Sequence, residues 1–259
     1  MNIWLDMEIK GATRAPACSP SGWTGTCSVP MNDTSRYDLI IFDCDGVLVD
    51  SEVLSCEVVI DCLRRYGVEV DLDTVVDRLL GRSPRAIGDY CASFGHALPA
   101  DFYVQLGVSV RAAFATALKP VEGVARVLED LKTSYCVASS SDLDRIDYSL
   151  EVTGLSPLVD GRRFSAEMVP HGKPAPDIFL LAASDMGSVP ERTLVIEDSV
   201  SGVKAGKAAG MTVWGFLGGS HYANRDGRRL LIEAGADRVF DRMADFHRPS
   251  AGGIDGALR

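Results

Sequence analysis

The stretch LIIFDCDGVLVDS, residues 39–51, is the sequence feature that most constrains the fold of this chain. It opens with four apolar residues, as in a strand that is buried on both faces, and Asp43, Asp45 and Gly46 come directly afterwards. Strands buried on both faces are typical of a parallel sheet that is covered by helices. In open sheets of this kind, ligands bind outside the carboxyl ends of the strands. The stretch therefore predicts a first strand that leads straight into a polar site.

The rest of the sequence alternates between short apolar strands and amphipathic helices. Such alternation implies right-handed crossovers and an α/β fold with a doubly wound, Rossmann-like parallel sheet. The predicted strands cover residues 38–42, 135–139, 193–197, 211–216 and 237–240, and the predicted helices between them cover 121–132, 142–152, 174–186 and 200–209.

Residues 52–118 interrupt this alternation. Apolar residues recur there at helical spacing, as at Val58, Cys62 and Tyr66, and we find no convincing strand. The interval predicts an all-helical domain that is inserted after the first strand. We therefore expect an α/β core domain formed by residues 36–51 and 119–248.

The two ends of the sequence lack periodicity. Residues 1–35 are rich in Gly, Pro, Ser and Thr, which is typical of a flexible extension. We also expect residues 249–259 to form a flexible tail. The start of the sequence lacks the apolar segment of a secretory signal.

Charge and cysteine content limit the expected partners and location. The formal net charge is -10 and no long basic run occurs, so we expect no nucleic-acid partner. No stretch of about 18 apolar residues occurs, so we expect no membrane association. The cysteines number 7, which is odd, and form no CxxC pair, which indicates reduced thiols in the cytoplasm. No long heptad pattern stands out, so we expect a monomer.

Polar residues gather where the predicted strands end. Because the carboxyl ends of parallel strands meet at one edge of a sheet, we expect these residues to form one site. The residues are Asp43 and Asp45 after the first strand, Ser139, Ser140 and Ser141 at the second, Glu197 and Asp198 at a later one, and Lys173 in the loop HGKPAPD.

The carboxylates of this site require a counter-charge. Asp43, Asp45, Glu197 and Asp198 would raise one another's pKa and destabilise the fold if they were close together. A hard divalent cation with oxygen ligands resolves the repulsion, and Mg²⁺ also shares phosphate oxygens. We therefore expect Mg²⁺ as the cofactor, with these acidic residues as its ligands.

The remaining polar groups suit an anion. The Lys173 ammonium and the Ser139 hydroxyl can hold anionic oxygens, and backbone N–H groups near Asp45 and Ser140 add further donors. A cation site next to such donors suits a phosphoryl group.

Four motifs of the sequence resemble those of the haloacid dehalogenase superfamily. DCDGVLVDS resembles the DxDGxxxDS signature, and VASSS, GKPAPD and IEDSVSGVKAGKAAGM resemble the other three motifs in order. The resemblance covers about residues 38–240, and the interval 52–118 resembles the helical cap of subfamily I. The motifs are most similar to those of the branch that contains sugar-phosphate phosphatases and β-phosphoglucomutase.

The resemblance implies roles for the acidic residues. Asp43 would be the nucleophile that forms an aspartyl-phosphate, and Asp45 would protonate the leaving alcohol and then activate water. The backbone carbonyl of Asp45 would also bind Mg²⁺. Asp198 would be a further metal ligand, with Glu197 in direct contact with the metal or just behind it.

The same resemblance implies the substrate contacts. Ser139, Ser140 and Lys173 would hold the phosphate. Arg82, in the turn LLGRSPRAI, would reach the substrate from the cap. Specificity would lie mainly in the cap, through Arg82 with Ser83 and Arg85.

These roles predict a phosphatase that hydrolyses a small phosphorylated metabolite, such as a phosphorylated sugar or sugar acid. A phosphomutase of the β-phosphoglucomutase type is the first alternative. Mutases of that type carry a histidine and a Lys-Asn pair where Ser55, Asp142 and Leu143 stand here, which favours hydrolysis. A non-catalytic binding protein on the same fold is the second alternative. Dehalogenating relatives lack an acid at the position of Asp45, and phosphonatases use a cap lysine, which residues 52–118 do not contain.

Several polar residues near these motifs are expected to have no part in catalysis. We predict that Asp50, Ser51 and Ser199 cap helices. We expect His171 and His221 to be solvated loop residues.

Overall fold

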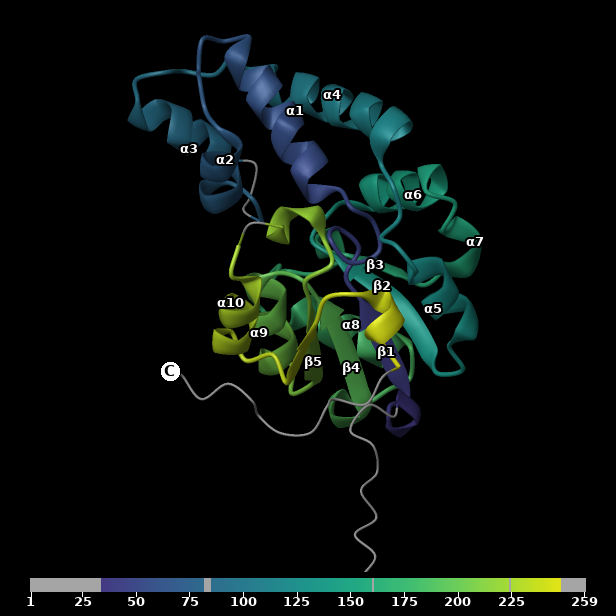
Figure 1. Cartoon of the computed structure of the whole chain (residues 1–259). Helices are drawn as coiled ribbons and strands as arrows, with labels where there is room; N and C mark the ends of the chain where they lie inside the picture. Colours follow the sequence, from purple (N-terminus) through teal and green to yellow (C-terminus); the bar gives the residue numbers. More distant parts are fainter. Residues whose placement is uncertain (1–33, 82–84, 160, 224, 248–259) are drawn as a thin grey trace, which may run out of the picture.

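The computed structural model describes residues 34–81, 85–159, 161–223 and 225–247 (Figure 1). The expected N-terminal extension, except for its last two residues, lies outside this part of the chain. The expected tail 249–259 and the predicted substrate contact Arg82 lie outside it as well.

The described residues form one parallel sheet of six strands in the order β3-β2-β1-β4-β5-β6. β1 lies at the centre, between β2 and β4, as in doubly wound folds. The predicted α/β fold class is confirmed, although β3 was not predicted from the sequence. The strands are β1 (Leu39–Phe42), β2 (Ser134–Ser139), β3 (Arg163–Ser165), β4 (Thr193–Glu197), β5 (Thr212–Phe216) and β6 (Arg238–Phe240).

Helices cover both faces of the sheet because the strands are apolar on both faces. Ile40 and Phe42 point into a core with α5, α6 and α7, whereas Leu39 and Ile41 point into a core with α8, α9 and α10. Among the described residues, no helix is long and apolar enough to span a membrane. The helices are α5 (Val124–Asp130), α6 (Leu143–Val152), α7 (Ser156–Val159), α8 (Asp177–Asp185), α9 (Val200–Ala208) and α10 (Gly227–Glu233).

Between β1 and α5 the described chain contains helices and no strand. Figure 1 shows these helices at the top of the molecule, on the side of the sheet where β1 leads into α1. They have a core of their own, in which Leu63, Cys91 and Phe102 are fully buried. We refer to residues 52–118 as the helical insertion, and the division into domains at these residues remains a prediction. The helices are α1 (Glu52–Arg64), α2 (Leu72–Arg78), α3 (Arg85–Ser93) and α4 (Phe102–Ala117).

The two chain segments that join the helical insertion to the sheet run side by side. The Asp50 N–H donates to the Lys119 carbonyl at 3.0 Å, and the Val121 N–H donates to the Leu48 carbonyl at 2.9 Å. The prediction that Asp50 caps α1 is wrong. Its carboxylate instead accepts hydrogen bonds from the backbone N–H and the hydroxyl of Ser220, at 2.9 and 2.8 Å.

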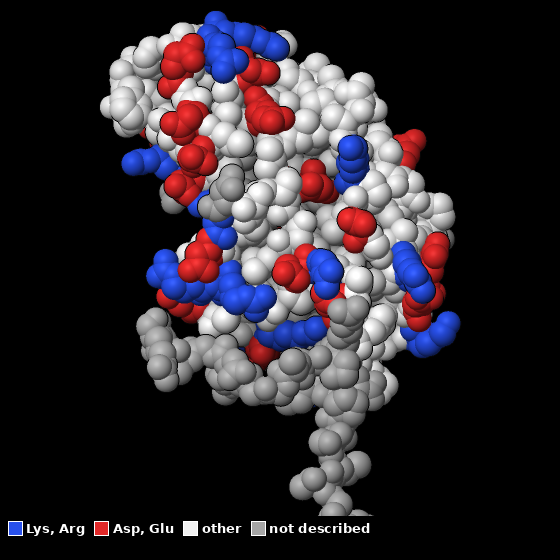
Figure 2. Space-filling model, viewed as in Figure 1, with Lys and Arg blue, Asp and Glu red and all other residues white. Residues whose placement is uncertain are grey.

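Charged side chains of both signs are mixed on the surface. Figure 2 shows Lys and Arg intermixed with Asp and Glu over the face that it presents. The absence of a nucleic-acid partner remains a prediction from the sequence.

Candidate active site

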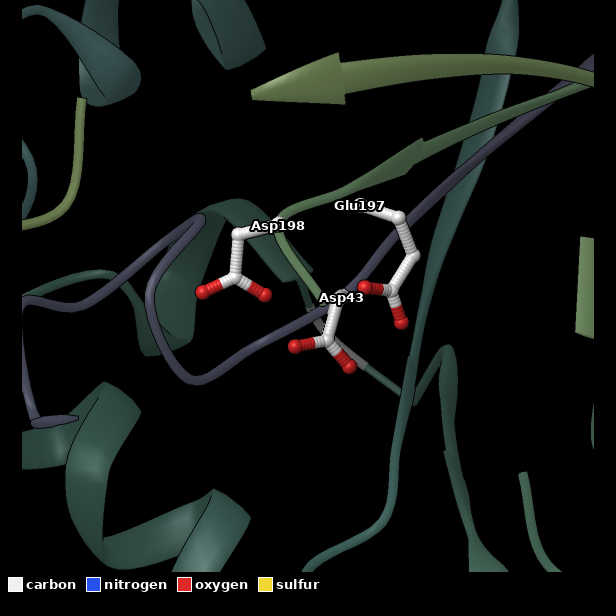
Figure 3. A group of neighbouring side chains, drawn as sticks. All are labelled: Asp43, Glu197 and Asp198. Atoms are coloured by element: carbon white, nitrogen blue, oxygen red, sulfur yellow. The ribbon is translucent and has the colours of Figure 1, made fainter. Parts of the chain in front are cut away.

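Three buried carboxyl groups meet at the carboxyl ends of β1 and β4. Asp43 follows β1, while Glu197 and Asp198 come from the end of β4, and each offers an oxygen within 4.8 Å of the others. Figure 3 shows the three carboxyl groups gathered at one place. Their neighbouring strands bring together residues that lie about 150 positions apart in the sequence, as expected for the edge of a parallel sheet.

Lys173 lies between these carboxylates. Its Nζ is 2.5 Å from Asp43 Oδ1 and 2.7 Å from Glu197 Oε1, and it also donates to the Ala138 carbonyl at 3.0 Å. Its side chain is only 3% exposed. A lysine that is buried among acidic groups keeps its charge, and its pKa is raised because the attraction of Asp43 and Glu197 outweighs the effect of burial.

One lysine does not balance three carboxylates. Burial, together with repulsion from Glu197 and other neighbouring carboxylates, raises the pKa of Asp43 to about 8 despite the attraction of Lys173. Burial and the neighbouring carboxylates raise the pKa of Asp198 well above its usual range. Without a cation this cluster therefore retains protons near neutral pH. An all-oxygen donor set with excess negative charge fits Mg²⁺.

Glu197 has other partners as well. Its Oε2 accepts from the backbone N–H of Ser199 at 2.8 Å and from the Ser199 hydroxyl at 2.9 Å, while Oε1 accepts from Lys173. The hydroxyl of Ser199 also accepts from the Gly202 N–H, which confirms that Ser199 caps α9. Both oxygens of Glu197 are thus engaged in holding Lys173 and the β4–α9 turn.

Gly46 brings the backbone close to Asp198. Its φ is +79°, a left-handed conformation that glycine adopts without strain. A Cβ at this position would lie 1.8 Å from Asp198 Oδ2. The glycine therefore allows the turn after β1 to pass beside the acidic cluster.

Replacing Gly46 by Ala should displace the Asp198 carboxylate and weaken metal binding. We expect the Mg²⁺ concentration for half-maximal activity to rise about 10-fold or more, because the added methyl group occupies the place of a ligand oxygen. Gly95→Ala is the matched control, since its φ of +80° imposes similar backbone strain but nothing lies within 4 Å of its added Cβ. Equal Mg²⁺ dependence in the two variants would contradict this role.

Asp45 lies in a cage of donors on the other side of the site. Its Oδ1 accepts from the Ser51 hydroxyl at 2.7 Å and from Arg145 Nη2 at 3.1 Å. Its Oδ2 accepts from the hydroxyls of Ser141 at 2.7 Å and Ser139 at 3.3 Å. Burial alone would raise the pKa of Asp45, but the charge of Arg145 and these hydrogen bonds lower it to about 2. Asp45 is thus ionised in this conformation.

These groups line one cleft between the sheet and the helical insertion, with a volume of about 550 Å³. Ser140 is exposed at its rim, and Ser139 is buried inside it. Gly81 of the helical insertion also lines the cleft. The cleft brings together the predicted catalytic, metal-binding and phosphate-binding residues that the structure describes: Asp43, Asp45, Ser139, Ser140, Lys173, Glu197 and Asp198. Arg85, which we expected to contribute to specificity, is exposed at the start of α3 and does not line this cleft.

Sequence reasoning missed several residues of the site. Glu52 and Arg145 line the cleft, and neither was predicted to do so. The prediction that His221 is solvated is wrong, because it is buried with Nε2 3.4 Å from Asp198 Oδ2. Ser51 lies at the start of α1 but makes no capping hydrogen bond, since its hydroxyl donates to Asp45.

A signal for Arg145 was available in the sequence. It lies in the first turn of the helix that follows the predicted strand 135–139. Such turns border the ligand crevice of an open α/β sheet. For His221 we see no comparable signal.

The fold and the site together define a class of protein. The family described as haloacid dehalogenase-like hydrolase matches residues 37–210 of the chain. The chain therefore belongs to the haloacid dehalogenase-like hydrolases, as the motifs predicted.

Known proteins of this family are similar over most of their length. The 6-phosphogluconate phosphatase of Escherichia coli is 27% identical over 190 residues, which cover 72% of this chain and 86% of that protein. A phosphorylated carbohydrates phosphatase of Thermotoga maritima is 32% identical, over 77% of this chain and 92% of that protein. A crystal structure of a family hydrolase from Deinococcus radiodurans, with bound phosphate and sodium, is 34% identical with a TM-score of 0.70. The matched region covers 81% of this chain and 93% of the chain from Deinococcus radiodurans.

Proposed function

We propose that the protein is a Mg²⁺-dependent phosphatase that hydrolyses small phosphorylated sugars or sugar derivatives through an aspartyl-phosphate. The observation that carries this proposal is the position of Asp43. Its carboxylate lies at the end of β1, 2.5 Å from Lys173 Nζ and beside Glu197 and Asp198. A carboxylate next to a fixed cation and a metal site can attack a phosphorus atom whose charge is neutralised.

The relatives support the same reaction and the same kind of substrate. Two of them are named as phosphatases of 6-phosphogluconate and of phosphorylated carbohydrates. The related hydrolase crystallised with phosphate is consistent with a phosphate-binding cleft. A monomeric state and a cytoplasmic location remain predictions from the sequence.

In the first half of the reaction, Asp43 attacks phosphorus while the bond to the leaving oxygen breaks. Asp45, which is ionised in the substrate-free site, would take up a proton as the phosphate monoester binds and would then give it to the leaving oxygen, so that an alcohol leaves. Lys173 would hold one phosphate oxygen, and the Ser139 hydroxyl and Ser140 N–H would hold others. Asp43, Asp198 and the Asp45 carbonyl would bind Mg²⁺, which supplies neutralisation of the phosphate charge when bound.

In the second half, water attacks the phosphorus of the aspartyl-phosphate. Asp45 would take a proton from this water, and the bond between phosphorus and Asp43 breaks. Inorganic phosphate leaves and both aspartates return to their starting protonation states. The cage of hydroxyl donors and Arg145 around Asp45 favours the ionised form that this step needs.

A phosphomutase remains the alternative. Ser55, Asp142 and Leu143 stand where mutases carry a histidine and a Lys-Asn pair, and the Ser55 hydroxyl donates to the Ser51 carbonyl at the start of α1. A screen of phosphorylated metabolites that includes sugar bisphosphates tests both functions. Release of inorganic phosphate as the main product supports the phosphatase, whereas isomerised sugar phosphate with little free phosphate would support the mutase.

Replacing Asp45 by Asn should affect substrates according to their leaving groups. We expect kcat/KM to fall by about 10²–10⁴-fold for an alkyl phosphate, because the alcohol must be protonated as it leaves. For p-nitrophenyl phosphate, kcat/KM should fall much less, since p-nitrophenolate leaves without a proton. The parameter kcat/KM excludes the later hydrolysis step, so equal losses for both substrates would argue against Asp45 as the acid.

A further inference from the structure

We infer that Arg145 binds an acidic group on the leaving part of the substrate, so that the enzyme prefers phosphorylated hydroxy acids or sugar acids to neutral sugar phosphates. This inference rests on the proposed phosphatase function and adds the substrate class to it. Arg145 is located on the sheet side of the cleft, in the first turn of α6. Its side chain is 28% exposed.

The position of Arg145 places its charge next to the leaving group. Asp45 is the residue that would contact the leaving oxygen, and Arg145 Nη2 lies 3.1 Å from Asp45 Oδ1. Lys173 and Arg145 are the two cationic side chains among the described residues that line the cleft. Because Lys173 is held beside Asp43, where the phosphate reacts, Arg145 is the cation left for a second anion.

The charge of Arg145 has one acidic partner at hydrogen-bonding distance among the described residues, Asp45. Its other described contacts are uncharged: the Ser55 hydroxyl at 3.2 Å and the ring of Phe114, 4.8 Å from the guanidinium carbon. Its Nε is buried without a hydrogen-bond partner in the described part of the chain. A guanidinium with unused donors is suited to a carboxylate, which it can bind through two hydrogen bonds.

Two further acidic residues line the cleft, Glu52 and Asp142. The Asp142 carboxylate is engaged at the start of α6, where it accepts from the backbone N–H of Arg145 at 2.7 Å. Burial, followed by repulsion from Asp45, raises the pKa of Glu52 to about 8, which favours its protonated form. A protonated carboxyl can donate a hydrogen bond to an anionic or hydroxyl oxygen of the substrate.

Matched pairs of substrates test this inference. The two members of each pair have the same number of carbon atoms, but the first carries a carboxylate where the second carries a hydroxymethyl group. The pairs are phosphoglycolate and 2-hydroxyethyl phosphate, 3-phosphoglycerate and glycerol 1-phosphate, and 6-phosphogluconate and sorbitol 6-phosphate. The ratio of kcat/KM, acid over neutral, is measured with Mg²⁺ for wild type, Arg145→Met, Arg145→Lys and the control Arg126→Met. Arg126 is on α5 with a side chain that is 87% exposed, away from the cleft.

For wild type and Arg126→Met we expect a ratio of about 10 or more in at least one pair. Arg145→Met should bring that ratio to about 1, and Arg145→Lys should retain part of it because a positive charge remains. A wild-type ratio near 1 in all three pairs, or a ratio that survives in Arg145→Met, would overturn the inference while leaving the phosphatase function intact. Absence of phosphate release from every substrate, including p-nitrophenyl phosphate, would instead overturn the proposed function and this inference with it.

Discussion

Asp43→Asn should reduce phosphate release from p-nitrophenyl phosphate by about 10⁴-fold or more. The amide cannot act as the nucleophile, and an enzyme that loses its nucleophile keeps only the catalysis due to binding and charge. An asparagine side chain has nearly the same size as the aspartate that it replaces, so the fold should survive. Circular dichroism and thermal unfolding of the variant should therefore match the wild type.

The control for this experiment is Asp185→Asn, which changes an exposed aspartate at the end of α8. It should retain full activity. Acid-quenched enzyme offers a second measurement, because wild type should contain a covalent phosphate during turnover and Asp43→Asn should not. Equal rates in wild type and Asp43→Asn would refute the catalytic role of Asp43.

Chelation by EDTA should abolish activity, and Mg²⁺ should restore it. The structural reason is the buried cluster of Asp43, Glu197 and Asp198, whose excess negative charge one lysine does not balance. Binding of Mg²⁺ to the folded state alone also stabilises it, by about 2.7 kcal/mol at a concentration roughly 100 times Kd. For a protein of this size that corresponds to a rise in Tm of about 5–10 °C.

The stabilisation by Mg²⁺ should grow with pH. The pKa of Asp43 is raised to about 8 in the folded protein, above its ordinary value of 3.8. The stability that this group contributes is therefore fully present below pH 3.8 and is lost as the pH rises towards 8. Metal-free protein should thus have a lower Tm at about pH 8 than at about pH 6, and Mg²⁺ should reduce this difference. Activity that persists in EDTA, or a Tm that does not change on addition of Mg²⁺ at the higher pH, would count against the metal site.

The sequence predicted the parts of the fold that have a strong local signal. The strand 193–197 was located at its observed bounds because TLVIE is a continuous run that can be buried on both faces. The edge strand β3, Arg163–Ser165, was missed because three residues with one large apolar side chain carry no periodicity. Strand pairing rather than local composition defines such an element.

The candidate site was predictable where it follows strand ends and unpredictable where it depends on distant pairs. Asp43, Asp45 and Glu197 stand directly after or at the end of apolar strands, so the sheet geometry alone predicts that they meet. The contact of Asp45 with Arg145 joins residues 100 positions apart. Asp50 and its partner Ser220 are 170 positions apart. Because the sequence shows only that Asp50 precedes a helix, capping of that helix was the role it predicted.

The two paired crossings between the sheet and the helical insertion have a mechanical consequence. Hydrogen bonds of 3.0 and 2.9 Å join the two connecting segments to each other, so they form one short paired connection rather than two independent linkers. A rotation of the insertion relative to the sheet would therefore take place about the line of this connection, and it would widen the cleft most at the greatest distance from the two segments. Loop-length changes in one crossing would tilt this pivot and alter which leaving groups fit, while both aspartates after β1 stay in place.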